Sequence, residues 1–133
     1  MRLVGKLIKD KRGQALVELA LALPLLIFII MGTMEFGRIF HSYLLITNAS
    51  REGARAGIIS ETDPEIKTTV KNVAATLGLT DAQITITPDE SFRTRGIPLT
   101  VKVDYTVSLI TPVLDAIVPD PFPLTASTTM RVE

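Results

Sequence analysis

The sequence contains no cysteine, no tryptophan and a single histidine, His41. Without cysteine the chain forms no disulfide, so an exported domain would be stabilised by its core alone. Closed zinc sites take four ligands that are mainly cysteine and histidine, which makes such a site a poor expectation here. We therefore expect neither a metal nor another cofactor.

Motifs of catalysis and nucleotide binding are missing as well. No G-x-S-x-G, Walker or dinucleotide-binding pattern occurs. His41 falls on a helical pattern, where a lone histidine is usually a surface residue. Asp89 and Glu90 follow Pro88, and such a pair is more typical of a solvated turn than of a weak calcium site. We expect a protein that is not an enzyme.

The charges balance overall but are unevenly distributed. Residues 1–13 hold five basic side chains and one acidic one, a net charge of +4, so the remainder carries −4. Basic residues concentrated before an apolar stretch favour an N-terminus that stays in the cytoplasm. The mildly acidic remainder gives no reason to expect nucleic-acid binding.

A nearly unbroken apolar run follows at residues 15–34. As a helix rising about 1.5 Å per residue it would be roughly 30 Å long, enough to cross a bilayer. Secretory signal peptides have shorter apolar cores, and residues 32–37 make a poor cleavage site. We expect a retained single span in the cytoplasmic (inner) membrane, with the C-terminal part extracytoplasmic. Pro24 predicts a kink within it.

Glu18 lies inside the run, where a carboxylate costs about 2.5–3.5 kcal/mol, so it is a functional candidate. The alternative is an accidental charge hydrated at the interface. If the chain were cut after Gly13, Gln14 would become the N-terminus, and Glu18 would be its neighbour one helical turn on. Ammonium and carboxylate could then neutralise each other, within one subunit or between adjacent ones. This register behind a basic leader is the processing pattern of type IV prepilins.

Beyond the run the helical pattern continues to about residue 58. Phe40 and Tyr43 would lie near the outer membrane interface, where aromatic residues are enriched. Residues 48–57 are polar and rich in small side chains, which suits packing between subunits and an exposed helix end equally well.

The remaining residues predict a small α+β domain. Thr62, Pro64 and Glu65 signal the start of a second, short helix that ends at Gly78. Alternating apolar residues predict three strands in an antiparallel sheet, at 83–87, 98–109 and 124–132. The side chains expected to face inward are Ile84 and Ile86 in the first strand, every second residue from Leu99 to Leu109 in the second, and every second residue from Leu124 through Thr128 to Val132 in the third. Between the last two strands, 111–123 is apolar and proline-rich, and we favour a short helix folded onto the sheet over a flap that touches the membrane or a partner.

These elements define three predicted segments. Residues 1–13 are a basic leader, 14–58 are the helix with its membrane span, and 59–133 are the extracytoplasmic α+β domain. We expect 62–133 to fold without metal or disulfide.

Several stretches together resemble the TadE-like pseudopilin family of tight-adherence pilus systems. They are RGQALVELA at 12–20, Leu-Pro at 23–24, EFGR at 35–38, TNASREGAR at 47–55 and LTASTTMR at 124–131. The resemblance implies cleavage between Gly13 and Gln14 by a membrane prepilin peptidase, and a role for Glu18 in maturation or assembly. It also implies a minor subunit or assembly factor whose partners are other pilins, pseudopilins or the assembly platform.

Two hypotheses stay open at this point. One is the processed pseudopilin of a type IV pilus or a related secretion apparatus. The other is an unprocessed, membrane-tethered module that binds an extracytoplasmic ligand. Further residues considered for packing or partner contact, without a chemical role, are Pro24, Arg51, Glu52 and Arg55.

Overall fold

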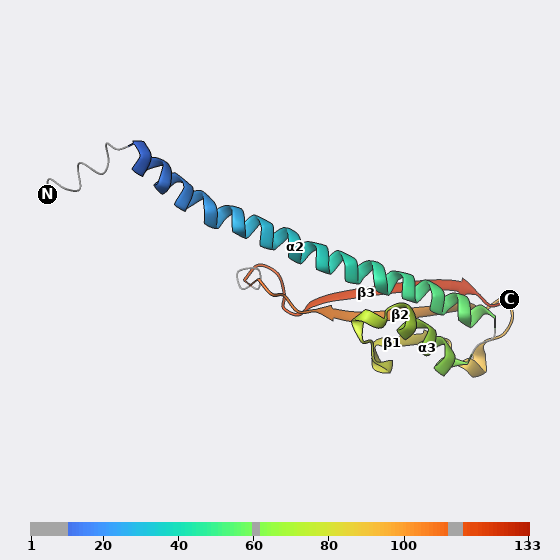
Figure 1. Ribbon diagram of the computed structural model, residues 1–133. Coiled ribbons are helices and arrows are strands. Elements are labelled where there is room, and N and C mark those ends of the chain that lie inside the picture. The colour runs from blue at the N-terminus through green and yellow to red at the C-terminus, as the bar shows by residue number, and fades with distance from the viewer. Residues whose placement is uncertain (1–10, 60–61, 112–115) are drawn as a thin grey trace. The chain divides into compact units, whose positions relative to one another are not determined.

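A computed structural model describes residues 11–59, 62–111 and 116–133 (Figure 1). Two α-helices, α2 (Lys11–Ile58) and α3 (Asp63–Val73), precede the antiparallel strands β1 (Ile84–Thr87), β2 (Pro98–Val107) and β3 (Phe122–Arg131). Short 3-10 helices separate them: η1 (Ala75–Leu77), η2 (Asp81–Gln83) and η3 (Glu90–Phe92). The predicted α+β fold class is confirmed. Residues 1–10 of the predicted leader lie outside the described residues.

The chain divides into two compact units, Met1–Phe36 and Gly37–Glu133, and the division falls within α2. In the described part of the first unit, α2 is the one element, and it continues through Pro24. Large apolar side chains are exposed along it, among them Leu16, Leu21 and Leu25. The predicted limits of leader, helix and domain remain predictions.

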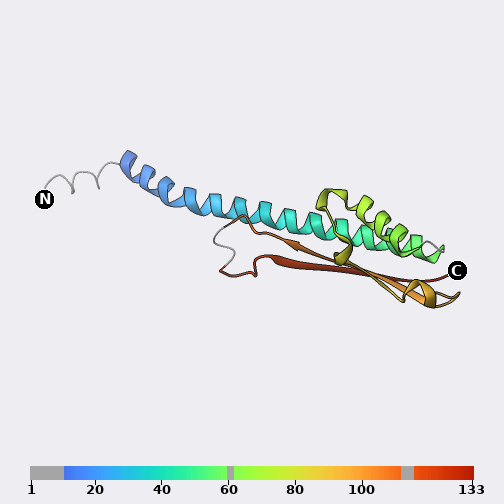
Figure 2. The ribbon, with the colours of Figure 1, turned by 90° about the horizontal axis from the view of Figure 1, so that it is seen from below.

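The second unit has two layers. Its sheet has the order β1-β2-β3, and the second half of α2 lies with α3 over one face of that sheet (Figure 2). The register pairs Ile84 with Val103, and Val103 with Ala126, so three strands contribute to one apolar face. All three of these side chains are buried.

The alternation in the strands is confirmed. Most side chains predicted to face inward are buried, as in Ile86 of β1, Val101 of β2 and Leu124 of β3, while Tyr105, Thr128 and Met130 are partly buried. β2 ends at Val107, so Leu109, predicted as its last inward residue, follows the strand.

The predicted start of α3 is confirmed. The Glu65 carboxylate accepts hydrogen bonds from the Thr62 backbone N–H at 2.8 Å and from the Thr62 hydroxyl at 2.9 Å. This satisfies a donor that the first helical turn leaves without a partner. The α-helix ends at Val73, and η1 prolongs it to Gly78, whose left-handed φ of 61° suits glycine.

The core includes the second half of α2. Ile46, Ala49, Ala54 and Ala56 are buried in it beside residues of α3 and the sheet. The small residues at 48–57, predicted to pack between subunits or to end the helix in solvent, therefore pack within the chain. A core built from residues 62–133 alone would lack this contribution.

The connection between β2 and β3 differs from the favoured short helix. Residues 116–121 form turns and bends, and β3 begins at Phe122. Residues 112–115 of the predicted helix lie outside the described residues. In the remainder, Pro119 and Pro121 interrupt the backbone hydrogen bonding that a helix requires.

Candidate functional site

Gln14 and Glu18, at the start of the apolar run, face each other. The Gln14 side-chain Nε2 donates a hydrogen bond of 3.2 Å to Glu18 Oε1, one turn along α2, and both residues are exposed. The contact follows from helix geometry, which stacks residues i and i+4 on one face. Glu18 is thus already directed towards the residue that cleavage would make the N-terminus.

Gly13 and Gln14, between which the chain is predicted to be cut, both lie within α2. Glycine in a helix is about 1 kcal/mol less favourable than alanine, so the helix is weaker at this bond than it would be with alanine at position 13. Removal of residues 1–13 would also bring Glu18 from the eighth residue of α2 to the fifth of the shortened chain, closer to the positive end of the helix dipole.

α2 is long and apolar enough to cross a membrane. Among the described residues it is the one helix that meets these criteria, over Gly13–Ile58. None of its most apolar stretch is buried by the rest of the protein, unlike the core helix of a soluble domain. This agrees with a single-pass membrane protein.

Arg51, Glu52 and Arg55 lie on the exposed side of α2, opposite the small residues that enter the core. Glu52 Oε2 and Arg55 Nε approach to 4.0 Å, a weak surface pair that leaves both side chains largely in solvent. Their exposure to solvent suits contact with a partner protein, and this role remains a prediction. The role of Pro24 in packing or partner contact remains a prediction as well.

A buried polar contact that the sequence analysis missed joins α2 to the sheet. Ser50 is fully buried, and its hydroxyl lies 2.7 Å from the hydroxyl of Thr128 in β3 and 3.1 Å from the Thr47 carbonyl oxygen. The pair links α2 to β3, and together with the bond to Thr47 it satisfies the buried Ser50 hydroxyl, which would be costly to leave without a partner. Thr128 was predicted to face inward, but no sequence signal pairs it with a serine 78 residues away.

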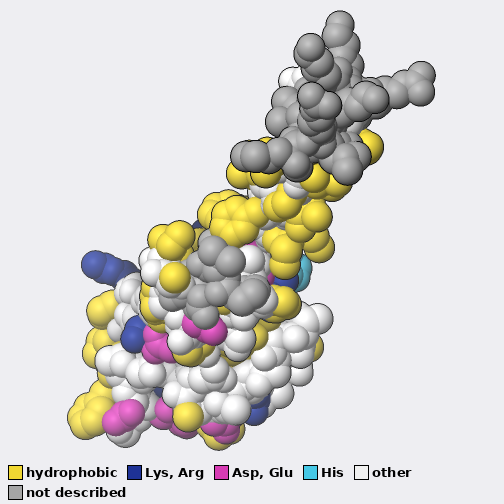
Figure 3. Space-filling model, turned by 90° about the vertical axis from the view of Figure 1, so that its left-hand side faces the viewer, with side chains coloured by type: hydrophobic (Ala, Val, Ile, Leu, Met, Phe, Trp, Pro, Cys, Tyr) yellow, Lys and Arg dark blue, Asp and Glu magenta, His cyan; other side chains and the backbone are white. Residues whose placement is uncertain are grey.

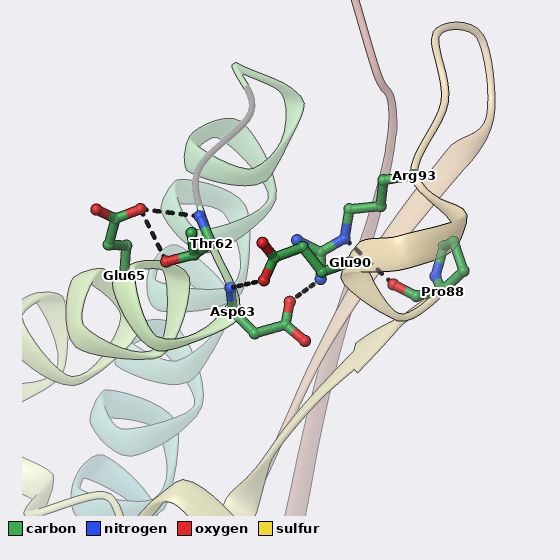
Figure 4. Close-up of polar contacts among 6 residues, drawn as sticks. All are labelled: Thr62, Asp63, Glu65, Pro88, Glu90 and Arg93. Atoms are coloured by element: carbon green, nitrogen blue, oxygen red, sulfur yellow. Dashed lines mark hydrogen bonds and ion pairs between the residues drawn. The ribbon is translucent and has the colours of Figure 1, made fainter.

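A second cluster missed in the sequence ties the β1–β2 connection to the start of α3 (Figure 4). Arg93 pairs with the Asp63 carboxylate through Nη2 and donates a 3.2 Å hydrogen bond from Nε to the Pro88 carbonyl oxygen. The Glu90 carboxylate accepts a 3.3 Å hydrogen bond from the Asp63 backbone N–H. Asp89 and Glu90, read as a solvated turn, thus border a structural contact.

The pKa shifts and the ion pair in this region are those of a contact that stabilises the fold. Burial lowers the pKa of the Arg93 guanidinium, and the facing Asp63 carboxylate offsets the cost of holding that charge in a side chain only 6% exposed. The hydrogen bonds from Thr62 lower the pKa of Glu65. Each of these charged groups is paired with a neighbouring residue, which is typical of a structural contact rather than of a reactive site. We call the contacts of Arg93 and Glu90 with Asp63 the clamp between the β1–β2 connection and α3.

Within 11–59, 62–111 and 116–133, no group of three or more acidic, histidine or cysteine side chains is placed to hold a metal ion. His41 is exposed on α2. No described arrangement brings it to a nucleophile.

Residues 13–55 match the family described as TadE-like protein. The match begins at Gly13, includes Glu18, Pro24 and the polar stretch that ends at Arg55, and thus confirms the resemblance over this segment. No curated protein and no solved structure matches the chain.

Proposed function

We propose that this chain, TadE-like over residues 13–55, is a pseudopilin-like component of a tight-adherence type IV pilus or a related secretion apparatus. The TadE-like segment and the membrane-length helix fit a membrane protein of such a system. In this proposal the protein is not an enzyme and acts as a minor subunit or assembly factor. Its N-terminus is cytoplasmic, and its α+β domain is extracytoplasmic.

One observation carries the proposal: Gly13, Gln14 and Glu18 share the start of a membrane-length helix. A prepilin peptidase would cut between Gly13 and Gln14. The hydrogen bond between Gln14 and Glu18 supports this proposal, because it puts the carboxylate within a turn of the new ammonium. That ammonium would supply the opposite charge that a carboxylate in a bilayer needs.

The proposed partners follow from this arrangement. Within the membrane, the Glu18 carboxylate of one subunit would pair with the N-terminus of its own or an adjacent pilin helix. Outside it, Arg51, Glu52 and Arg55 would contact other pilins, pseudopilins or the assembly platform from the exposed side of α2.

The test is the intact mass of the protein extracted from membranes of its own host. Native protein should lack residues 1–13, whereas Gly13→Leu should retain them, because a bulky side chain would obstruct the peptidase. Gly32→Leu is the matched control, since a side chain at Gly32 meets nothing within 4 Å in the chain, and its processing should be normal. A native protein that retains residues 1–13 would favour the unprocessed, membrane-tethered binding module instead.

A further inference from the structure

Gln14 would become the N-terminal residue after the proposed cleavage, and an N-terminal glutamine can react with itself. Its free α-amine can attack the side-chain carbonyl carbon, Cδ, of the same residue. A new C–N bond then closes a lactam ring, the bond between Cδ and Nε2 breaks, and Nε2 leaves as ammonia with a proton from the amine. Because amine and amide belong to one residue, the reaction needs only rotation about side-chain bonds.

Ring closure would remove the positive charge of the new N-terminus, because the nitrogen of a lactam is an amide. Glu18 is the sole carboxylate in the sequence of residues 14–34. It would then lie near the start of the span without the ammonium that is proposed to neutralise it. The pairing proposed for Glu18 therefore depends on whether the ring of Gln14 stays open.

The structure holds the Gln14 amide by a contact that competes with ring closure. Nε2 donates its 3.2 Å hydrogen bond to Oε1 of Glu18, one turn farther along α2. To close the ring, the side chain has to fold back onto its own backbone nitrogen. The bond to Glu18 has to break first, so the leaving group of the reaction is occupied in the open form.

The Glu18 carboxylate would act on the attacking amine as well. A neighbouring negative charge favours the protonated form of an amine, and an ammonium has no free electron pair with which to attack Cδ. Hydrophobic side chains dominate the part of the apolar helix that is visible in Figure 3. Such a surface suits lipid, where little solvent is present to screen a charge pair.

A carboxylate could also accelerate the reaction, by taking a proton from the amine and passing it to the leaving nitrogen. Glu18 already contacts that nitrogen, so the two effects oppose each other. An ionised carboxylate beside an ammonium stabilises the proton on the amine. Protection is therefore the favoured effect as long as the pair persists.

We propose that Gln14 is a cyclisation site of the cleaved chain and that Glu18 protects it, through the hydrogen bond to Nε2 and an ion pair with the new ammonium. Protection preserves the N-terminal charge until the subunit meets its partners in an assembly. This inference rests on the cleavage in the function proposed above. It gives Glu18 a role within its own chain, before any contact between subunits.

The test follows the loss of one ammonia by intact mass over time. A removable fusion partner replaces residues 1–13, and a site-specific protease releases it after reconstitution into vesicles of phosphatidylcholine and phosphatidylglycerol. The chain 14–133 then begins with Gln14 at time zero, without a prepilin peptidase.

Near pH 7, Glu18→Gln should lose ammonia about three to ten times faster than the wild type, because glutamine still accepts a hydrogen bond but carries no charge. Glu18→Asp keeps the charge on a shorter side chain and should lie between them. Glu133→Gln is the matched control, since it is the same change at an exposed residue of the C-terminus, and its rate should equal that of the wild type.

The pH dependence separates protection of the amine from a general change in the helix. Near pH 10, above the ordinary range of an α-amine, the amine is largely neutral in every variant, so the rates of Glu18→Gln and the wild type should converge. Equal rates near pH 7, slower closure in Glu18→Gln, or no loss of ammonia in any variant would each overturn the proposal.

The wild-type protein from its own host distinguishes this proposal from the cleavage on which it rests. A cleaved protein that keeps its ammonia would support protection. A cleaved protein that is fully cyclised would overturn protection and leave the cleavage intact. Retention of residues 1–13 would instead contradict the cleavage, while the fusion experiment would still decide the effect of Glu18 on Gln14.

Discussion

The guanidinium of Arg93 pairs with the carboxylate of Asp63, thirty residues earlier in the chain. The pair joins the β1–β2 connection to the first turn of α3, and the Pro88 carbonyl oxygen takes a second Arg93 hydrogen bond. Since the Arg93 side chain is 6% exposed and that of Asp63 31%, solvent screens this pair less than an ordinary surface pair. Two segments that share no strand pairing are thereby held together.

Replacement of Arg93 by methionine should lower the free energy of unfolding by about 1–3 kcal/mol, because it leaves a half-buried carboxylate without its charged donor. The measurement is chemical unfolding of the detergent-solubilised chain, followed by near-ultraviolet circular dichroism of the domain. Arg95→Met is the control, since Arg95 is exposed in the same connection and its replacement should change stability little. Equal stability of the Arg93 variant and the wild type would contradict the clamp.

Gly53→Ala should destabilise the domain by about 1–3 kcal/mol, the usual cost of overpacking a core. A Cβ at Gly53 would collide with Cγ2 of Val70 and lie 3.3 Å from Cγ1 of Val101. Valine has one side-chain torsion with a strong preference, so Val70 cannot easily move its methyl group away.

Gly37→Ala is the same chemical change on the same helix, and there the added Cβ meets nothing within 4 Å. It should be neutral or stabilise by up to about 1 kcal/mol, because alanine is the better helix former. The same unfolding measurement on both variants should therefore give changes of opposite sign or very different size. Equal effects would show that helix propensity, and not close approach, sets the cost at Gly53.

A fragment of residues 37–133 should fold, and one of residues 62–133 should not. The shorter fragment lacks Ile46, Ala49, Ala54 and Ala56, which belong to the core. The longer fragment should show dispersed amide resonances and cooperative thermal unfolding. Addition of a peptide of residues 37–59 to the shorter fragment should restore dispersion. Cooperative unfolding of 62–133 by itself would mean that α2 is an accessory to the core rather than part of it.

Stability of the 37–133 fragment should fall in acid. The pKa values of three carboxyl groups are lowered in the folded state: Glu65 by hydrogen bonds from Thr62, Asp81 by Lys71, and Asp104 by Thr125 and then Lys102. Just below the ordinary values of 4.5 for Glu65 and 3.8 for the aspartates, the unfolded chain binds more protons than the folded one. Their contribution is thus complete above these values and is lost as the pH falls through the lower, folded-state values.

Urea unfolding of this fragment between pH 6 and pH 2 measures the effect. Glu65→Gln should reduce the fall in the free energy of unfolding that begins near pH 4.5 as the pH is lowered, since glutamine does not titrate. A profile that is identical for the two proteins would rule out a contribution from the Thr62–Glu65 cap.

Glu18→Gln should reduce pilus formation without affecting synthesis, membrane insertion or cleavage. Glutamine keeps the shape of the side chain but removes the charge that would pair with the new N-terminus. Insertion should be unaffected or slightly easier, because a neutral side chain costs less to place in the bilayer.

The readout for Glu18 is pilus number and co-purification of pilus components in a complemented host strain, with protein level and processing checked. Asp89→Asn, which removes an exposed carboxylate outside the predicted span and away from the proposed partner contacts, is the control for loss of charge alone. A Glu18→Gln protein that is cleaved and inserted normally and still supports wild-type piliation would refute the assembly role.

The sequence by itself determined the features that depend on local spacing. Alternation predicted the three strands and their inward faces, because successive residues of a strand point to opposite sides. The spacing of Thr62 and Glu65 predicted the cap of α3, and that of Gln14 and Glu18 predicted their contact on one helix face, because both distances are set within a single turn. The apolar length of α2 predicted a membrane span in the same way.

The tertiary structure decided what lies across long sequence separations. Residues 48–57 read as a surface stretch, yet Ala49, Ser50 and Gly53 face the core, because close approach of the sheet and α3 favours small side chains. The same small side chains would serve between subunits, so composition cannot distinguish the two uses. The partners of Ser50 and Arg93, Thr128 and Asp63, likewise come from distant segments that only the packing of the sheet brings within hydrogen-bonding distance.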